Sequence, residues 1–298
     1  MPVFTRLTDR GVLAIRGEDR VAFLQGLVSN DVAAVAPDRA IHAAFLTPQG
    51  KYLHDFFIVE RGEALLLDCE VERRADLMRR LKIYKLRARV EIADETESWA
   101  VAAIHGEGAV AAIGGGAIPG AALPFAGGVA YVDPRLAALG ARAIVPADRA
   151  EESLAAAGLE AADRRDWDAL RLSLGVPDGS RDLEVEKSTL MESGFDELNG
   201  ISWQKGCYMG QELTARTKYR GLVKRRLVPI ALDGPPPAAG TAITRDGKPV
   251  GEVRSGLALD GGGRALALIR LEVLKDDSPL DASGISVRPH RPAWMAPA

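Results

Sequence analysis

Apolar runs in this chain are short, and this limits what it can fold into. A charged residue or a glycine interrupts each of them within about ten residues, well below the roughly 20 that a membrane-spanning helix needs. The first twenty residues carry charges from Arg6 onward and contain no apolar region of the kind that a secretory signal has. We therefore expect a soluble chain with no membrane partner.

The spacing of the apolar residues predicts both strands and helices in the first two thirds of the chain. Strand patterns occur over residues 12–15, 40–46, 52–59, 64–69, 99–104, 131–133 and 141–145. Helical patterns occur over residues 19–29, 71–86, 150–159 and 162–174, and residues 106–128 are rich enough in Gly and Ala to predict a loop. The pattern favours an α+β fold.

The last part of the chain is rich in strand patterns, and a stiff break at Gly234 and the three prolines that follow it comes after the first of them. Strand-like segments occupy residues 227–232, 241–245, 249–254, 264–271 and 285–289, which predicts a small barrel or sandwich. We expect residues 221–298 to form a C-terminal β-barrel. Residues 1–220 then form an α/β core of two subdomains, roughly 1–45 with 155–220, and 46–154.

Charge and cysteine content narrow the function classes. The 298 residues have a formal net charge of −3, which argues against a surface built throughout to neutralise nucleic-acid phosphates. The two cysteines, Cys69 and Cys207, stand in unlike surroundings, and the four histidines stand singly, so the spacing predicts neither a disulfide framework nor a metal cage. We expect a reducing, cytoplasmic location.

Residues 203–226 contain the densest mixture of glycine, thiol, aromatic and charged groups in the chain. Lys205 precedes Gly206 and Cys207, and residues 209–217 have helical propensity, which places Cys207 at or just before a helix N-terminus. An ammonium group and the positive end of a helix dipole both favour a thiolate, which is a better nucleophile and metal ligand than a thiol. The alternative is a small buried cysteine.

Other residues of this segment suit a flat heterocycle. Gly206 and Gly210 permit a close backbone approach, and Gln211 and Glu212 offer directional hydrogen bonds to the amide and amine edge of a pterin. A tight turn and a helix cap would also explain these residues. The basic residues that follow, over 216–226, would suit a polyglutamylated folate tail or RNA, or would simply be solvated.

The segment Lys205-Gly-Cys-Tyr-Met-Gly-Gln-Glu212 resembles the K-G-C-Y-x-G-Q-E signature of the YgfZ family of folate-binding iron–sulfur assembly factors. The likeness extends to residues 23–31, 45–50 and 170–177, and to residues 198–202, where this chain has one glycine only. It therefore covers most of residues 1–226.

The resemblance implies an α+β fold like that of the glycine-cleavage aminomethyltransferase, with three modules in a ring around a folate cleft and a C-terminal β-barrel. It also implies tetrahydrofolate, or a one-carbon derivative of it, as the bound cofactor. The implied function is assembly or repair of four-iron clusters in client enzymes, dependent on Cys207. Iron–sulfur carrier or client proteins are the implied partners.

The expected site residues fall into two groups. Cys207 is the expected nucleophile or transient ligand of an iron–sulfur cluster, with Lys205 tuning it, and a partner or second copy would have to complete the four ligands. The expected folate contacts are Asn30, Asp31, Glu184, Glu186, Trp203, Tyr208, Gly210, Gln211 and Glu212.

Two other functions stay open. One is a folate-dependent aminomethyltransferase or other one-carbon transferase, although His54-Asp55 stands here where those transferases have paired aspartates. The other is a tRNA-modification partner that uses the basic residues 216–226; the acidic net charge argues against nucleic acid. The resemblance favours an assembly factor active under oxidative stress over a classical enzyme.

Overall fold

The computed structural model describes residues 1–275 and 278–296 and contains two compact units. The first unit comprises Met1–Pro48, Leu53–Trp167 and Leu198–Gln211. The second comprises Gln49–Tyr52, Asp168–Glu197 and the chain from Glu212 onward. The chain therefore passes between the two units several times.

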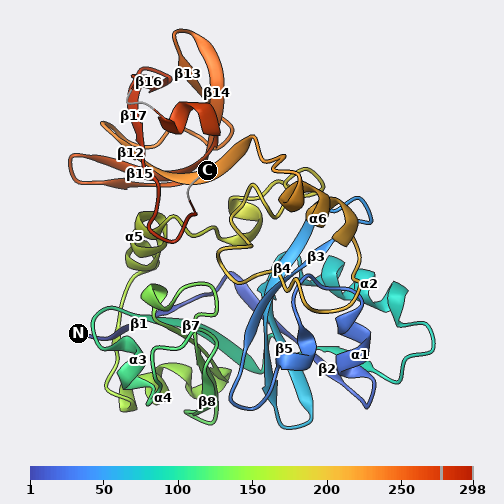
Figure 1. Ribbon diagram of the computed structural model, residues 1–298. Coiled ribbons are helices and arrows are strands. Elements are labelled where there is room, and N and C mark those ends of the chain that lie inside the picture. The colour runs from blue at the N-terminus through green and yellow to red at the C-terminus, as the bar shows by residue number, and fades with distance from the viewer. Residues whose placement is uncertain (276–277, 297–298) are drawn as a thin grey trace. The chain divides into compact units, whose positions relative to one another are not determined.

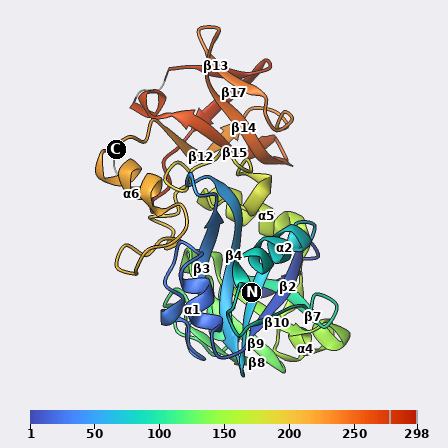
Figure 2. The same cartoon turned by 90° about the vertical axis from the view of Figure 1, so that its right-hand side faces the viewer.

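A five-stranded sheet forms one half of the first unit (Figure 1). Its strand order is β3 (Ile41–Leu46), β4 (Tyr52–Arg61), β5 (Ala64–Glu70), β2 (Arg10–Arg16), β6 (Glu91–Asp94). The central strands are buried along nearly their whole length, as expected for a sheet covered on both faces. Helix α2 (Arg74–Lys85) packs against β2 and β6 (Figure 2), and α1 (Arg20–Gln25) follows β2 in the chain.

A six-stranded sheet forms the other half of this unit. Its order is β11 (Glu160–Ala161), β1 (Val3–Arg6), β7 (Trp99–His105), β10 (Ala141–Pro146), β9 (Gly128–Val132), β8 (Ala122–Phe125). The short helices α3 (Ala109–Ala112) and α4 (Ala150–Ala156) pack on it, and their buried residues share a core with Phe4, Ile104 and Val145. Small alanines in β7 and β10 let these elements approach closely.

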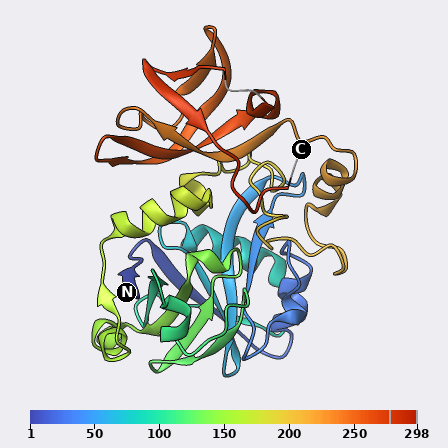
Figure 3. The same ribbon diagram turned by 60° about the vertical axis from the view of Figure 1, so that its left-hand side comes forward.

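The second unit contains a closed six-stranded barrel, drawn in orange to red in Figures 1 and 3. Its order is β12 (Arg225–Leu232), β15 (Gly262–Arg270), β14 (Lys248–Leu259), β13 (Ala242–Arg245), β16 (Leu280–Ala282), β17 (Ile285–Pro289). Alternate residues such as Val228 and Ile230 on β12 fill its interior. Closure leaves no long sheet edge exposed.

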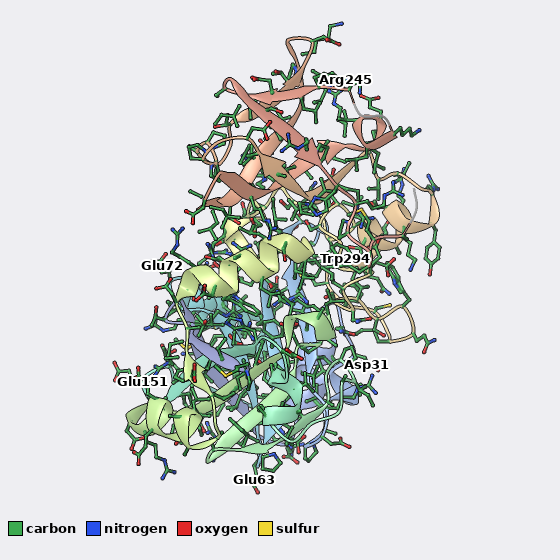
Figure 4. All side chains as sticks on the ribbon, turned by 90° about the vertical axis from the view of Figure 1, so that its left-hand side faces the viewer. Asp31, Glu63, Glu72, Glu151, Arg245 and Trp294 are labelled. Carbon is green, nitrogen blue, oxygen red and sulfur yellow. The ribbon has the colours of Figure 1, made fainter. Side chains whose placement is uncertain are left out.

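Helix α5 (Arg164–Leu174) contributes its second half to the same unit. Trp294 lies beside the end of this helix (Figure 4) and donates through Nε1 to the Leu174 carbonyl, at 2.7 Å. The buried Arg171 donates to Asp182 and to Ser255 Oγ, each at 2.9 Å. These bonds join α5 and a loop to the barrel strand β14.

The remaining described elements are short. They are α6 (Gln211–Tyr219) and the 3-10 helices η1 (Val32–Ala34), η2 (Ala137–Leu139), η3 (Ala147–Arg149), η4 (Gly179–Arg181) and η5 (Leu271–Lys275). No helix in the described part of the chain has the length and apolar character that a membrane crossing requires.

The α+β class and the C-terminal barrel are as predicted. The loop prediction for residues 106–128 was wrong in part, because this segment contains α3 and β8. Short strands such as β1, β6, β11 and β16 were also missed, because two to four residues are too few to show a repeating apolar pattern.

Candidate functional site

The two segments that were singled out in the sequence lie side by side in the first unit. Ser202 N donates to the Ser29 carbonyl at 3.0 Å, and Met209 N donates to the Gly26 carbonyl at 3.2 Å. Ser29 Oγ donates to the Gly200 carbonyl at 2.6 Å. The loop that carries Cys207 is therefore held along the segment between α1 and η1.

Lys205 is the main side-chain anchor of this loop. Its ammonium donates to the carbonyls of Val28 and Asn30, each at 2.7 Å, and lies 5.3 Å from the ring centroid of the buried Tyr208. Burial lowers the pKa of Lys205 to about 8, against a smaller opposing effect of the Asp31 charge. The predicted tuning of Cys207 by Lys205 stays a prediction, because the hydrogen bonds of this ammonium go to Val28 and Asn30.

Cys207 and Cys69 have opposite environments. Cys207 is exposed, in the loop four residues before the first residue of α6. Cys69 is buried in β5, and burial raises the pKa of its thiol to about 12. Of the two, Cys207 is the thiol that can meet a reagent, a metal ion or another protein.

Asn30 and Asp31 join this loop to the neighbouring strand. Asn30 Nδ2 donates to the carbonyls of His42 and Asn199, each at 2.8 Å. Asp31, labelled in Figure 4, caps η1: its Oδ1 accepts from Ala33 N at 3.1 Å and from Gln25 Nε2 at 2.7 Å. Both side chains thus stabilise the segment around η1, independently of any ligand.

Both residues line a pocket of about 600 Å³ within the first unit. Its other lining residues include Arg39, Asn199, Ser202 and Gln204, which sequence reasoning missed. The guanidinium of Arg39 is exposed, and acceptors and donors are both present. This set can hydrogen-bond the amide and amine edge of a pterin and pair with a carboxylate.

The other predicted folate contacts do not line this pocket. Trp203, Tyr208, Gly210 and Gln211 belong to the same unit, where Gly210 has a positive φ of 80° just before α6. Glu184, Glu186 and Glu212 belong to the second unit, where Glu184 pairs with Lys187 and Arg254, each at 3.2 Å. Their roles stay predictions.

His54 and Asp55 are both buried and paired. Asp55 accepts from His42 Nε2 at 2.9 Å, and His54 Nε2 lies 3.0 Å from Asp76. Burial, assisted by the charge of Arg73, lowers the pKa of His54 to about 4. His54 is thus a neutral partner of Asp76 near pH 7.

Within the described ranges, 1–275 and 278–296, no group of three or more His, Cys, Asp or Glu side chains is placed to hold a metal ion. Cys207 therefore offers a single ligand.

Comparison with known proteins places this geometry in a class. The structure is similar to that of glycine cleavage system aminomethyltransferase T from Bartonella henselae, with a TM-score of 0.79 and 16% sequence identity over 99% of this chain and 86% of that chain. Residues 224–297 match the family model described as the CAF17 C-terminal beta-barrel domain. The chain thus has an aminomethyltransferase-like fold with a C-terminal β-barrel, as the sequence predicted.

Relatives in sequence give the family. The chain is 34% identical to the human mitochondrial iron–sulfur cluster assembly factor IBA57, over 93% of this chain and 80% of that protein. It is 32% identical to the mouse protein of the same name, over 91% of this chain and 78% of that protein. The chain belongs to the family of the iron–sulfur cluster assembly factor IBA57.

These relatives correct one expectation. They and their fungal counterparts are named as mitochondrial proteins, which contradicts the predicted cytoplasmic location. The prediction failed because two unpaired cysteines indicate a reducing compartment without distinguishing one such compartment from another.

Proposed function

We propose that this protein is an accessory factor for the assembly or repair of iron–sulfur clusters, and that it binds tetrahydrofolate and acts through Cys207. The observation that carries the proposal is the anchored loop. Six hydrogen bonds between residues 199–209 and residues 26–30 hold the segment that resembles the YgfZ signature, and that segment exposes Cys207. Membership of the IBA57 family supports the cluster role.

One thiol cannot hold a cluster, because iron–sulfur clusters ordinarily take four protein ligands. In this proposal the cluster is cargo that Cys207 binds only while a carrier or client protein supplies the other ligands. The thiol must then be exposed, as Cys207 is, and its loop must keep a fixed position.

In this proposal folate occupies the pocket lined by Asn30, Asp31, Arg39 and Gln204. A pterin needs hydrogen-bond donors and acceptors on one edge, and the glutamate tail of folate needs a cation. The Gln204 amide and the Asp31 carboxylate would supply the first and Arg39 the second, whereas both donors of the Asn30 amide are already bonded to the carbonyls of His42 and Asn199.

The test is complementation in cells that lack their own factor of this family. Wild type, Cys207→Ser and Cys69→Ala are expressed, and the activity of a four-iron enzyme is measured. We expect wild type and Cys69→Ala to restore activity and Cys207→Ser to fail while remaining folded. Restoration by Cys207→Ser would remove the thiol from the proposal.

A folate-dependent one-carbon transferase is the second candidate, and Asp55 favours it, because this residue places a carboxylate on β4, buried beside His42. It predicts that Asp55→Asn abolishes complementation whereas Cys207→Ser does not. The assembly proposal predicts the opposite response of the two variants.

A further inference from the structure

The basic run of residues 216–226 divides into two sets. Lys218 Nζ lies 2.9 Å from Asp196, Arg225 Nε lies 3.0 Å from Glu192, and Arg226 Nη2 lies 2.8 Å from Glu197. These three cations are neutralised by one acidic segment of the same unit, and they stabilise the fold there.

The other set is Arg216, Arg220 and Lys224. All three are exposed, and none forms an ion pair with any carboxylate in the residues that the structure describes. A cation that is buried without a partner loses its hydration at a large cost in free energy, whereas an exposed cation keeps its hydration. Their charge is therefore available to a binding partner.

Apolar side chains are exposed among these free cations. Leu213 is 36% exposed, Tyr219 is 73% exposed and Leu222 is 47% exposed. On α6 the buried residue is Thr214, whereas Leu213, Arg216 and Arg220 recur at the spacing of residues that share one helix face. We call Leu213, Arg216, Tyr219, Arg220, Leu222 and Lys224 the α6 surface.

A capping motif ends α6 within this surface. Gly221 adopts a φ of 59°, its N–H donates to the Lys218 carbonyl, and the next N–H, of Leu222, donates to the Thr217 carbonyl. This is the Schellman arrangement, in which the residue after the glycine normally covers an apolar residue of the last turn. Leu222 remains half-exposed instead, which leaves it available for contact.

Chain length keeps this surface near Cys207. The four residues from Cys207 to Gln211 span at most about 14 Å, and the rise of α6 from Gln211 to Arg216 adds about 8 Å. The Cα atom of Arg216 therefore lies within about 22 Å of the Cα atom of Cys207.

We propose that the α6 surface docks a protein whose contact face combines carboxylates with apolar side chains. Complementary charge would steer the encounter, and the exposed leucines would bury apolar area once contact is made. RNA is a poorer occupant, because Tyr219 alone provides no stacking platform. The choice of a cluster carrier or client as the natural partner rests on the proposed function, but the surface itself does not.

The test measures binding of three fluorescent probes to the full chain. They are an amphipathic peptide with glutamate and leucine on one helical face, a polyglutamate peptide, and a single-stranded RNA. The variants are Arg216→Glu/Arg220→Glu and Leu213→Ser/Leu222→Ser, with Lys248→Glu in the barrel as a control at another exposed cation. Circular dichroism checks that each variant is folded.

We expect the amphipathic peptide to bind wild type and Lys248→Glu equally, and both double variants at least about tenfold more weakly. If polyglutamate binds wild type as tightly as the amphipathic peptide does, and Leu213→Ser/Leu222→Ser weakens neither probe, the result would overturn the proposal in favour of a folate tail. Tighter binding of RNA would overturn it in favour of nucleic acid.

Complementation separates this proposal from the proposed function. Arg216→Glu/Arg220→Glu is expected to restore less activity than Lys248→Glu at equal expression. If it restores full activity while Cys207→Ser fails, the assembly role stands and the docking surface does not. If Cys207→Ser also restores activity, the proposed role of the thiol is contradicted. The peptide-binding measurement then still tests whether the α6 surface docks a protein.

Discussion

Asp68 and Arg142, which are 74 residues apart in the sequence, form a buried ion pair that joins the two sheets of the first unit. Asp68 on β5 lies 2.7 Å from Arg142 Nη2 on β10, and it also accepts from Arg10 at 2.6 Å and from Tyr131 at 3.2 Å. Burial opposes the ionised carboxylate, but the two guanidinium groups outweigh it and keep the pKa of Asp68 below its usual value.

Replacing Asp68 with asparagine should destabilise the protein by about 3 to 5 kcal/mol, because it leaves two buried guanidinium groups without their counter-charge. Urea unfolding measures the loss. Glu272→Gln is the control, since its pair with Arg270 is exposed and should contribute less than about 1 kcal/mol. Equal effects of the two changes would contradict this account of the buried pair.

Lys205→Met should lower the free energy of unfolding by about 1 to 3 kcal/mol, because the buried carbonyls of Val28 and Asn30 lose their donor. A variant as stable as wild type would show that Lys205 does not anchor the loop.

The same variant tests whether Lys205 also tunes Cys207. The rate of alkylation of Cys207 is measured against pH in Lys205→Met and in wild type. If the ammonium favours the thiolate, the midpoint of this profile should move to higher pH in the variant. If the midpoint is unchanged while stability falls, the role of Lys205 is anchoring only.

His54 should make stability fall as the pH drops from about 6.5 to about 4. In this window the imidazole is protonated in the unfolded chain but stays neutral in the folded protein, so protonation favours the unfolded state. We expect a loss of about 2 to 3 kcal/mol from this group. Urea unfolding of wild type and His54→Gln at pH 7 and pH 4.5 checks it, and a parallel decline in both proteins would assign the loss to other groups.

Arg39→Ala and Gln204→Ala should each weaken folate binding if folate occupies the pocket that they line. The loss of a carboxylate partner should cost about tenfold or more for Arg39. Glu212→Ala is the matched comparison, since Glu212 was predicted from the sequence but does not line this pocket. If only Glu212→Ala weakens binding in a folate titration, the site lies elsewhere.

The sequence predicted those features of the structure that are encoded by residues close together in the chain. The strand-like segments after about residue 221 identified the barrel region, because alternation of apolar residues acts within a few residues; the prolines at 235–237 lie inside it, between β12 and β13. The contact of Lys205 with Val28 joins residues 177 apart, so neighbouring residues contain no trace of it. Likewise, nothing in the run 216–226 itself separates Lys218, which has an acidic partner, from Arg220, which has none among the residues that the structure describes.

The predicted division of residues 1–220 into two subdomains stays a prediction. The predicted roles of Trp203, Tyr208 and Glu186 as folate contacts also stay predictions. These contacts depend on where a ligand lies, and the apolar pattern of a chain does not encode that.

The return of Leu198–Gln211 to the first unit has a consequence for synthesis on the ribosome. The segment 26–30 is made early, but the donors that satisfy its carbonyls at Val28, Ser29 and Asn30 emerge some 170 residues later. Until then these carbonyls must stay hydrated or be covered by a chaperone. The loop that presents Cys207 is thus completed late in translation, and a chain that ends before Ser202 would leave these carbonyls without their donors.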